Sequence, residues 1–161
     1  MTARTAVLIG LLLATPAFAH DPLEVGGAGI HILLDSKATG GSFGMFLVTQ
    51  PGADGPPRHI HADADEAFFV VEGEFEVLAG EKTAIIGEGQ AGFAPKGSVH
   101  TFRSTSEDGG KILVIVAPGG FEGFFRKVVA EGVTPESDLE RFLAISEEFQ
   151  QQMAGPPLGR E

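Results

Sequence analysis

The chain contains no cysteine, no tryptophan and no tyrosine, and it has few basic residues. Without cysteine neither a disulfide framework nor a thiolate metal site can form, so any metal site must use histidine and carboxylate side chains. Lys and Arg number 11 against 22 Asp and Glu, which gives a formal net charge of -11. This balance argues against nucleic acid and anionic lipid as partners. The five histidines then become the residues to account for.

The N-terminal apolar run, residues 6–14, is short for a membrane anchor, because a bilayer-spanning helix needs ~20 residues. Arg4 precedes the run, and a small-residue pattern follows it at residues 17–19. This arrangement predicts a secretory signal peptide over residues 1–19. We therefore expect a periplasmic or secreted protein with no stable membrane anchor after cleavage. His20 would be the new N-terminus and could chelate copper, but a site would need further fixed ligands, so a role for it stays open.

Between Gly26 and Pro118, short runs of β-branched and aromatic residues alternate with Gly, Pro and Asp. Examples are SFGMFLVT, EAFFVVEG, KTAIIG and KILVIVAP. Strands of this length at spacings near ten residues are typical of a β-sandwich or barrel. The roughly 142 residues left after cleavage suit one domain. We expect an all-β domain over residues 20–118.

After Pro118 the apolar spacing becomes that of a helix. A first stripe, which Gly132 can end, consists of Phe121, Phe124, Phe125, Val128 and Val129. A second helix is predicted from Thr134 as N-cap and Pro135 as first helical residue up to Gly155. Its buried side would carry Leu139, Phe142, Leu143, Phe149 and Met153. We expect both helices, within residues 119–155, to pack on the barrel, and residues 156–161 to form a flexible tail.

Four polar side chains are candidates for a metal site. His59 and His61 are two residues apart, so on an extended segment both imidazoles point the same way. Glu66 begins the next predicted strand, and His100 follows a bend at Pro95. Three imidazole nitrogens and one carboxylate suit a divalent transition metal and leave two positions open in an octahedral centre.

Read together, these residues resemble the two motifs of the cupin superfamily. The first motif appears as Gly52, His59, His61, Glu66 and Gly73, and the second as Gly89, Pro95, Gly97 and His100. Two departures occur: Ser104 stands where the second motif often closes with Asn, and six residues rather than five separate Gly52 from His59. Neither removes a ligand. The resemblance implies a cupin jelly-roll β-barrel with two C-terminal helices and one metal ion inside its mouth. The closer resemblance is to small single-domain bacterial proteins described as quercetin dioxygenase-like.

Apolar residues near the predicted ligands suggest a substrate pocket that ends at the metal. The candidate substrate-binding residues are Phe43, Met45, Leu47, Arg58, Phe68, Val70 and Phe102. Ordinary core filling is the alternative for each apolar member of this set. Arg58 would bind a substrate carboxylate or phenolate, or else form a salt bridge with Asp63 or Asp65. His31 lies among apolar residues and is expected to be a packed or edge-strand residue.

The leading functional hypothesis is a mononuclear dioxygenase that acts on a small aromatic or enol-bearing compound. His59, His61, Glu66 and His100 would hold the ion, with Glu66 also the catalytic base. Alternatives are a redox-neutral isomerase or lyase, and a non-catalytic extracytoplasmic cupin that binds metal or a small molecule. The ion could be Fe, Mn, Ni, Co, Cu or Zn, and uptake outside the cytoplasm would favour copper, nickel or zinc. Dioxygen and the substrate would be the partners, and the chain size also suits a homodimer.

Overall fold

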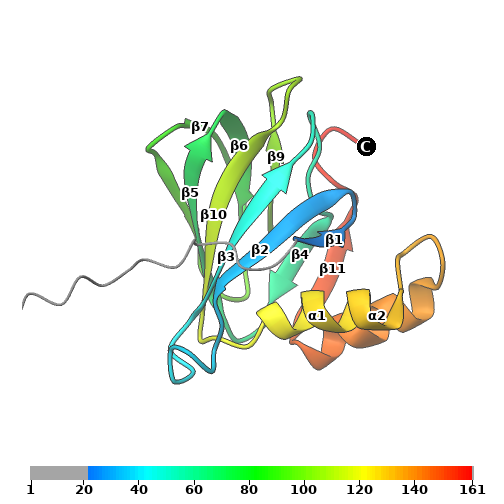
Figure 1. The fold of residues 1–161 in the computed structure, drawn as a ribbon. Helices are drawn as coiled ribbons and strands as arrows, with labels where there is room; N and C mark the ends of the chain where they lie inside the picture. Colours follow the sequence, from blue (N-terminus) through cyan, green and yellow to red (C-terminus); the bar gives the residue numbers. More distant parts are fainter. Residues whose placement is uncertain (1–21, 161) are drawn as a thin grey trace, which may run out of the picture.

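Two antiparallel sheets face each other in the computed structural model, which describes residues 22–160 (Figure 1). The six-stranded sheet has the order β1-β2-β3-β10-β5-β8, and the five-stranded sheet has the order β11-β4-β9-β6-β7. The first six strands are β1 (Leu23–Val25), β2 (Ala28–Leu34), β3 (Gly44–Gln50), β4 (Arg58–His61), β5 (Asp65–Glu72) and β6 (Glu74–Ala79). The others are β7 (Lys82–Gly87), β8 (Ala91–Ala94), β9 (His100–Ser104), β10 (Gly110–Ala117) and β11 (Gln151–Gly155). The predicted jelly-roll β-barrel is confirmed.

The barrel interior is filled by alternate residues of the central strands. Along β10, between β3 and β5 in its sheet, Ile112, Val114 and Val116 are fully buried, and the residues between them are only partly buried. Each strand thus turns one face inward, as the two-residue period of a strand requires. Phe68 and Phe75 are the largest apolar side chains that are fully buried in this core.

The two helices lie together on one side of the barrel, beside β1 and β11 (Figure 1). Helix α1 (Glu122–Glu131) buries Phe124, Phe125 and Val128 and ends at Gly132, which has a left-handed φ of 63°. This agrees with the predicted first helix, except that Val129 is 40% exposed. Two C-terminal helices are therefore confirmed.

The predicted second helix is wrong at both ends. Helix α2 runs only from Leu139 to Glu148, and its N-cap is Asp138, whose side chain accepts a hydrogen bond from the Arg141 backbone N–H. At Gln150 the backbone has a left-handed φ of 57°, and the chain continues as β11. This strand pairs with β4, whose backbone groups would otherwise lie unpaired at the sheet edge.

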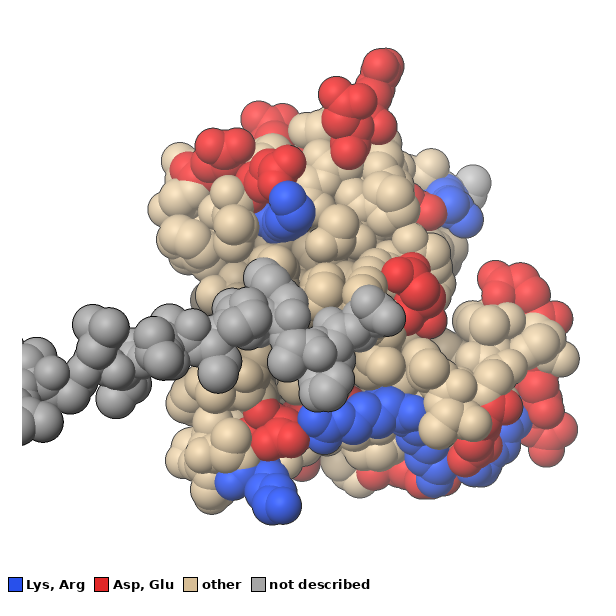
Figure 2. Space-filling view, in the orientation of Figure 1, with Lys and Arg blue, Asp and Glu red and all other residues tan. Residues whose placement is uncertain are grey.

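Ion pairs connect the helices to their surroundings. Arg126 pairs with Asp35 at 3.0 Å, Arg141 pairs with Glu131 at 2.7 Å, and Lys127 pairs with Glu148. On the face shown in Figure 2, basic side chains gather mainly along the lower edge, where acidic side chains adjoin them. Acidic side chains without basic neighbours stand at the top of that face.

Most predictions for the two ends of the chain are not tested by the structure. The predicted signal peptide, residues 1–19, and His20 lie outside the described residues. Within the described part, no helix is long and apolar enough to cross a membrane. After β11, Arg160 forms an ion pair with Asp54. The flexibility of residues 156–161 stays a prediction.

Candidate metal centre

Three strands bring four metal-binding side chains together between the sheets. His59 and His61 alternate along β4, so both face the barrel interior. His100 on β9 lies directly opposite His59 in the antiparallel pair. Glu66 comes from β5 in the other sheet. The predicted quartet is therefore assembled from both sheets.

The four side chains are buried and converge on one point. One ligand atom from each residue lies within 4.8 Å of every other, so the group could hold a single metal ion. Glu66 Oε2 lies 2.8 Å from His100 Nε2, 3.3 Å from His61 Nε2 and 3.9 Å from His59 Nε2. All four residues are at least nine-tenths buried. Bulk water therefore solvates the carboxylate poorly, and other groups must compensate most of its charge.

Backbone carbonyls fix the orientation of two imidazoles. His59 Nδ1 donates a hydrogen bond to Pro57 O at 2.8 Å, and His100 Nδ1 donates one to Ser98 O at 2.9 Å. A carbonyl oxygen only accepts, so each Nδ1 carries a proton and each Nε2 is left to face Glu66. Such outer hydrogen bonds are the usual way in which metal-binding histidines are oriented.

An unpartnered nitrogen supports the assignment as a cation site. His61 Nε2 is buried and makes no hydrogen bond. Together with the buried carboxylate of Glu66 and the other two imidazoles, it forms a group in which one hydrogen bond, between His100 and Glu66, leaves His61 Nε2 unpaired. A divalent cation would bind all four atoms at once. The residues therefore fit a metal ion, and the nitrogen and oxygen donors admit several transition metals.

Burial and mutual contact shift the pKa values of three quartet residues. Burial lowers the pKa of His59 to about 3, so this ring is neutral near pH 7. Burial opposes the ionisation of Glu66, but the combined attraction of His100 and His61 outweighs it and lowers the pKa of the carboxyl. Burial likewise opposes protonation of His100, and the contacts with Glu66 and the Ser98 carbonyl together outweigh it and raise the pKa of the ring. Glu66 is thus an anion and attracts positive charge.

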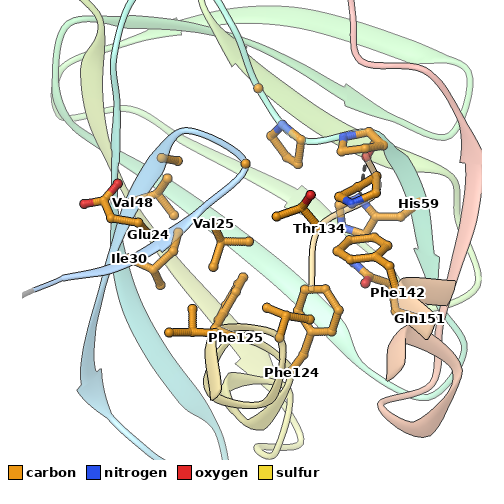
Figure 3. Close-up of a pocket in the computed structure, with 18 of the residues that line it drawn as sticks. Glu24, Val25, Ile30, Val48, His59, Phe124, Phe125, Thr134, Phe142 and Gln151 are labelled. Carbon is orange, nitrogen blue, oxygen red and sulfur yellow. Dashed lines mark hydrogen bonds between the residues drawn. The ribbon is translucent and has the colours of Figure 1, made fainter. Parts of the chain in front are cut away.

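A mainly apolar cavity of about 320 Å³ opens at the quartet (Figure 3). His59 and Glu66 form part of its wall. Apolar residues of β2, β3 and α1 supply most of the rest, among them Ile30, Phe46, Val48, Phe124, Phe125 and Val128. The described lining contains no Lys and no Arg. The cavity thus suits a small apolar molecule that reaches a metal with one end.

The comparisons with known proteins agree with this geometry. The model of a family described as "Cupin domain" matches residues 45–116, which include all four quartet residues. The chain contains a cupin domain over these residues. Among solved structures, the TT1209 protein of Thermus thermophilus is 27% identical, with a TM-score of 0.52, over 56% of this chain and 83% of that one.

Two curated relatives match shorter stretches of this cupin. An uncharacterized protein of Aquifex aeolicus (strain VF5) is 44% identical over 64 residues, which is 39% of this chain and 50% of the relative. Quercetin 2,3-dioxygenase of Bacillus subtilis (strain 168) is 30% identical over 76 residues, which is 47% of this chain and 22% of the enzyme. The chain spans half or less of the length of each relative.

The structure separates the predicted substrate-binding residues of this cupin into two groups. Phe102 lines the cavity. Phe43, Met45, Leu47, Arg58, Phe68 and Val70 are not part of its wall. Phe68 and Val70 are buried core residues, and Arg58 alternates with the inward-facing His59 along β4. Ordinary core filling, the stated alternative, therefore describes Phe68 and Val70.

The predicted wall on β3 is wrong by one residue. Met45 and Leu47 are only partly buried, whereas Phe46 and Val48 are buried and line the cavity. Because strand side chains alternate, a shift of one position places the whole set on the other face. The predicted Phe43 belongs to the same outward series.

Sequence reasoning missed the part of the wall that follows the barrel strands. Phe121, whose ring centroid lies 4.3 Å from that of His61, lines the cavity together with Phe142. Gln151 and Met153 of β11 also line it. The apolar stripes of the two predicted helices indicated that these residues are buried, but not that they line a cavity. The sequence QQMAG of β11 does not alternate apolar and polar residues, so it gave no signal for a strand.

Proposed function

We propose that this cupin is a metal-dependent dioxygenase that acts on a small, mainly apolar compound with an aromatic or enol group. One observation carries the proposal: His59 and Glu66 belong both to the metal-binding quartet and to the wall of the apolar cavity. A ligand in the cavity can therefore reach the ion directly. The similarity to quercetin 2,3-dioxygenase of Bacillus subtilis supports the reaction class.

The quartet would hold one divalent transition metal ion. When bound, such an ion supplies Lewis acidity toward an ionised substrate oxygen and, if redox-active, electrons for reaction with dioxygen. Glu66 accepts the proton of the substrate hydroxyl, because it is ionised and lies at the cavity wall. One dioxygen is consumed per substrate, and both of its atoms enter the products.

The cavity wall selects and shields the substrate. Phe121, Phe124 and Phe125 pack edge to face or stacked, with ring centroids 5.2–5.5 Å apart, and give aromatic surface to an aromatic ligand. An apolar wall also keeps water from the reacting carbon. Because the described lining offers no basic side chain, a ligand with a second anionic group would lack a partner there.

Oxygen uptake tests the proposal. The protein is purified, its metal content is measured by elemental analysis, and flavonols, catechols and diketones are supplied in an oxygen-electrode chamber. We expect uptake of one dioxygen per substrate consumed, and none with the His61→Ala variant. Substrate turnover without oxygen uptake would overturn the dioxygenase and favour the isomerase or lyase. Ligand binding without turnover would favour a binding protein.

Location bears on which metal is present. We propose from residues 1–19 that the protein acts outside the cytoplasm. If it acquires its ion there, affinity order favours copper, nickel or zinc over iron and manganese. Protein folded in the cytoplasm without these residues should then differ in metal content from exported protein.

A further inference from the structure

Gln151 places a buried amide beside the metal-binding histidines. In the β4–β11 pair, Gln151 lies opposite His61 and Met153 lies opposite His59. Side chains of directly opposed residues project from the same face of a sheet and lie close together. Gln151 therefore shares the inward face with both imidazoles. Figure 3 shows Gln151 and His59 at one end of the cavity and Glu24 at the other.

This amide has no partner among the described residues. Gln151 is 5% exposed, and its Oε1 is buried without a hydrogen bond. None of the hydrogen bonds found among residues 22–160 uses its side-chain nitrogen either. The conclusion does not depend on which amide atom is oxygen, because neither is paired. A buried amide without partners destabilises a fold, so packing alone gives no reason for glutamine at this position.

The surroundings indicate what the amide would bind. The Gln151 amide has one acceptor oxygen and two donor hydrogens but no charge. The described cavity lining offers no Lys or Arg, and the quartet would already compensate one ionised oxygen. A ligand that satisfies both sites carries a metal-binding hydroxyl and, next to it, a neutral carbonyl or hydroxyl oxygen.

We infer that Gln151 orients the substrate by a hydrogen bond to a neutral oxygen adjacent to the metal-binding one. The inference rests on the proposed function and narrows its substrate class to compounds such as α-hydroxy ketones and their enols. Gln151 thereby selects among apolar ligands that all fit the cavity. In this role it fixes which carbon of the substrate faces dioxygen.

The test uses 3-hydroxyflavone, which has a hydroxyl beside a carbonyl, and protein loaded with Co²⁺ under argon. The affinity of each protein for 3-hydroxyflavone is measured from the change in visible absorption, for wild type, Gln151→Leu and Gln151→Glu. The matched control is Gln152→Leu, since Gln152 is the same residue type on the same strand but is exposed. Metal content and Tm are recorded for every protein.

We expect Gln151→Leu to bind the flavonol about tenfold more weakly, because the variant lacks one hydrogen bond to the ligand. Gln151→Glu should bind still more weakly, because it adds a negative charge near the ionised hydroxyl. Metal content should be unchanged, and the Tm of Gln151→Leu should rise by about 3 °C, since the unpaired amide is gone. Gln152→Leu should match wild type in affinity.

Three results would overturn the inference. Affinity of Gln151→Leu within twofold of wild type would exclude a hydrogen bond to the ligand. A loss of affinity that parallels a loss of cobalt or of Tm would make Gln151 a structural residue. If loaded wild type does not bind 3-hydroxyflavone at all, the proposed function for this substrate class fails together with the inference.

Discussion

Glu66 and His61 have separable roles at the scale of single residues. His61 contributes a buried nitrogen that has no hydrogen bond, whereas Glu66 contributes the negative charge of the quartet. We predict that His61→Ala loses more than nine-tenths of its bound metal. Glu66→Gln should keep much of its metal, because an amide oxygen can still bind an ion, but should lose about 10²- to 10⁴-fold in turnover with its base. Elemental analysis and oxygen uptake, measured on the same samples, check both.

His31→Ala is the control for this pair, since His31 lies on β2 outside the quartet. It should retain metal and turnover. A Glu66→Gln protein that keeps its metal and turns over at the wild-type rate would exclude Glu66 as the base.

Single residues also show how far the sequence could predict the site. The spacing of His59 and His61 fixes their shared face. Glu66 and His100 were candidates from their positions at the start of a predicted strand and after a bend, and the cupin resemblance supported both. The wall of β3 could not be predicted, because Met45 and Leu47 are as apolar as Phe46 and Val48. When both faces of a strand are apolar, the sequence does not show which set of alternate residues faces the barrel interior.

At the scale of elements, hydrogen bonds to the Glu122 side chain connect the start of α1 to the barrel. Its carboxylate accepts hydrogen bonds from Ser36 N at 2.7 Å and Gly120 N at 2.9 Å, and the residue is only 2% exposed. Burial opposes the ionisation of Glu122, but the hydrogen bonds from Ser36 and from the backbone of Gly120 and Glu122 together outweigh it and lower the pKa of the carboxyl. The charged form therefore stabilises the connection between α1 and the segment after β2.

This lowered pKa predicts a pH-dependent stability. Above about pH 4.5, the ordinary pKa of Glu, the stabilisation is complete, and it is lost as the pH falls through the folded-state value. Glu122→Gln should be less stable than wild type by about 1–3 kcal/mol at pH 7 and by less at pH 3. Urea unfolding of both proteins at the two pH values measures this difference. A difference that grows toward pH 3 would contradict the assignment.

Elements differ in how well the sequence predicts them. The stripe that begins at Phe121 identified α1, and Gly132 marked its end. The α2–β11 boundary was missed because Phe149 and Met153 fit a helical spacing, while Met153 fits a strand equally well. The pairing of β11 with β4 depends on a partner far away in the chain, which local spacing does not reveal.

The metal site connects both sheets at the scale of the whole molecule. Three ligands come from the five-stranded sheet and Glu66 comes from the six-stranded sheet. An ion that binds only the folded barrel stabilises it by mass action, by about 2.7 kcal/mol at a free concentration of 100 Kd. We predict that removal of the metal with a chelator lowers the Tm by about 5–10 °C. Differential scanning calorimetry of treated and reloaded protein measures the shift.

The His61→Ala variant is the matched control, because it lacks one ligand and should show little change on chelation. An equal shift in this variant would place the stabilising ion elsewhere. An unchanged Tm in wild type would mean that the quartet holds no ion in solution.

The position of β4 in its sheet determines when this site can form during synthesis of the chain. β4 pairs with β9 only through His59 and His100, but with β11 along its whole length. A nascent polypeptide that has produced β9 already carries all four ligands, yet the strand with two of them lacks its main neighbour. We therefore expect the ion to be captured late, only once β11 has paired with β4.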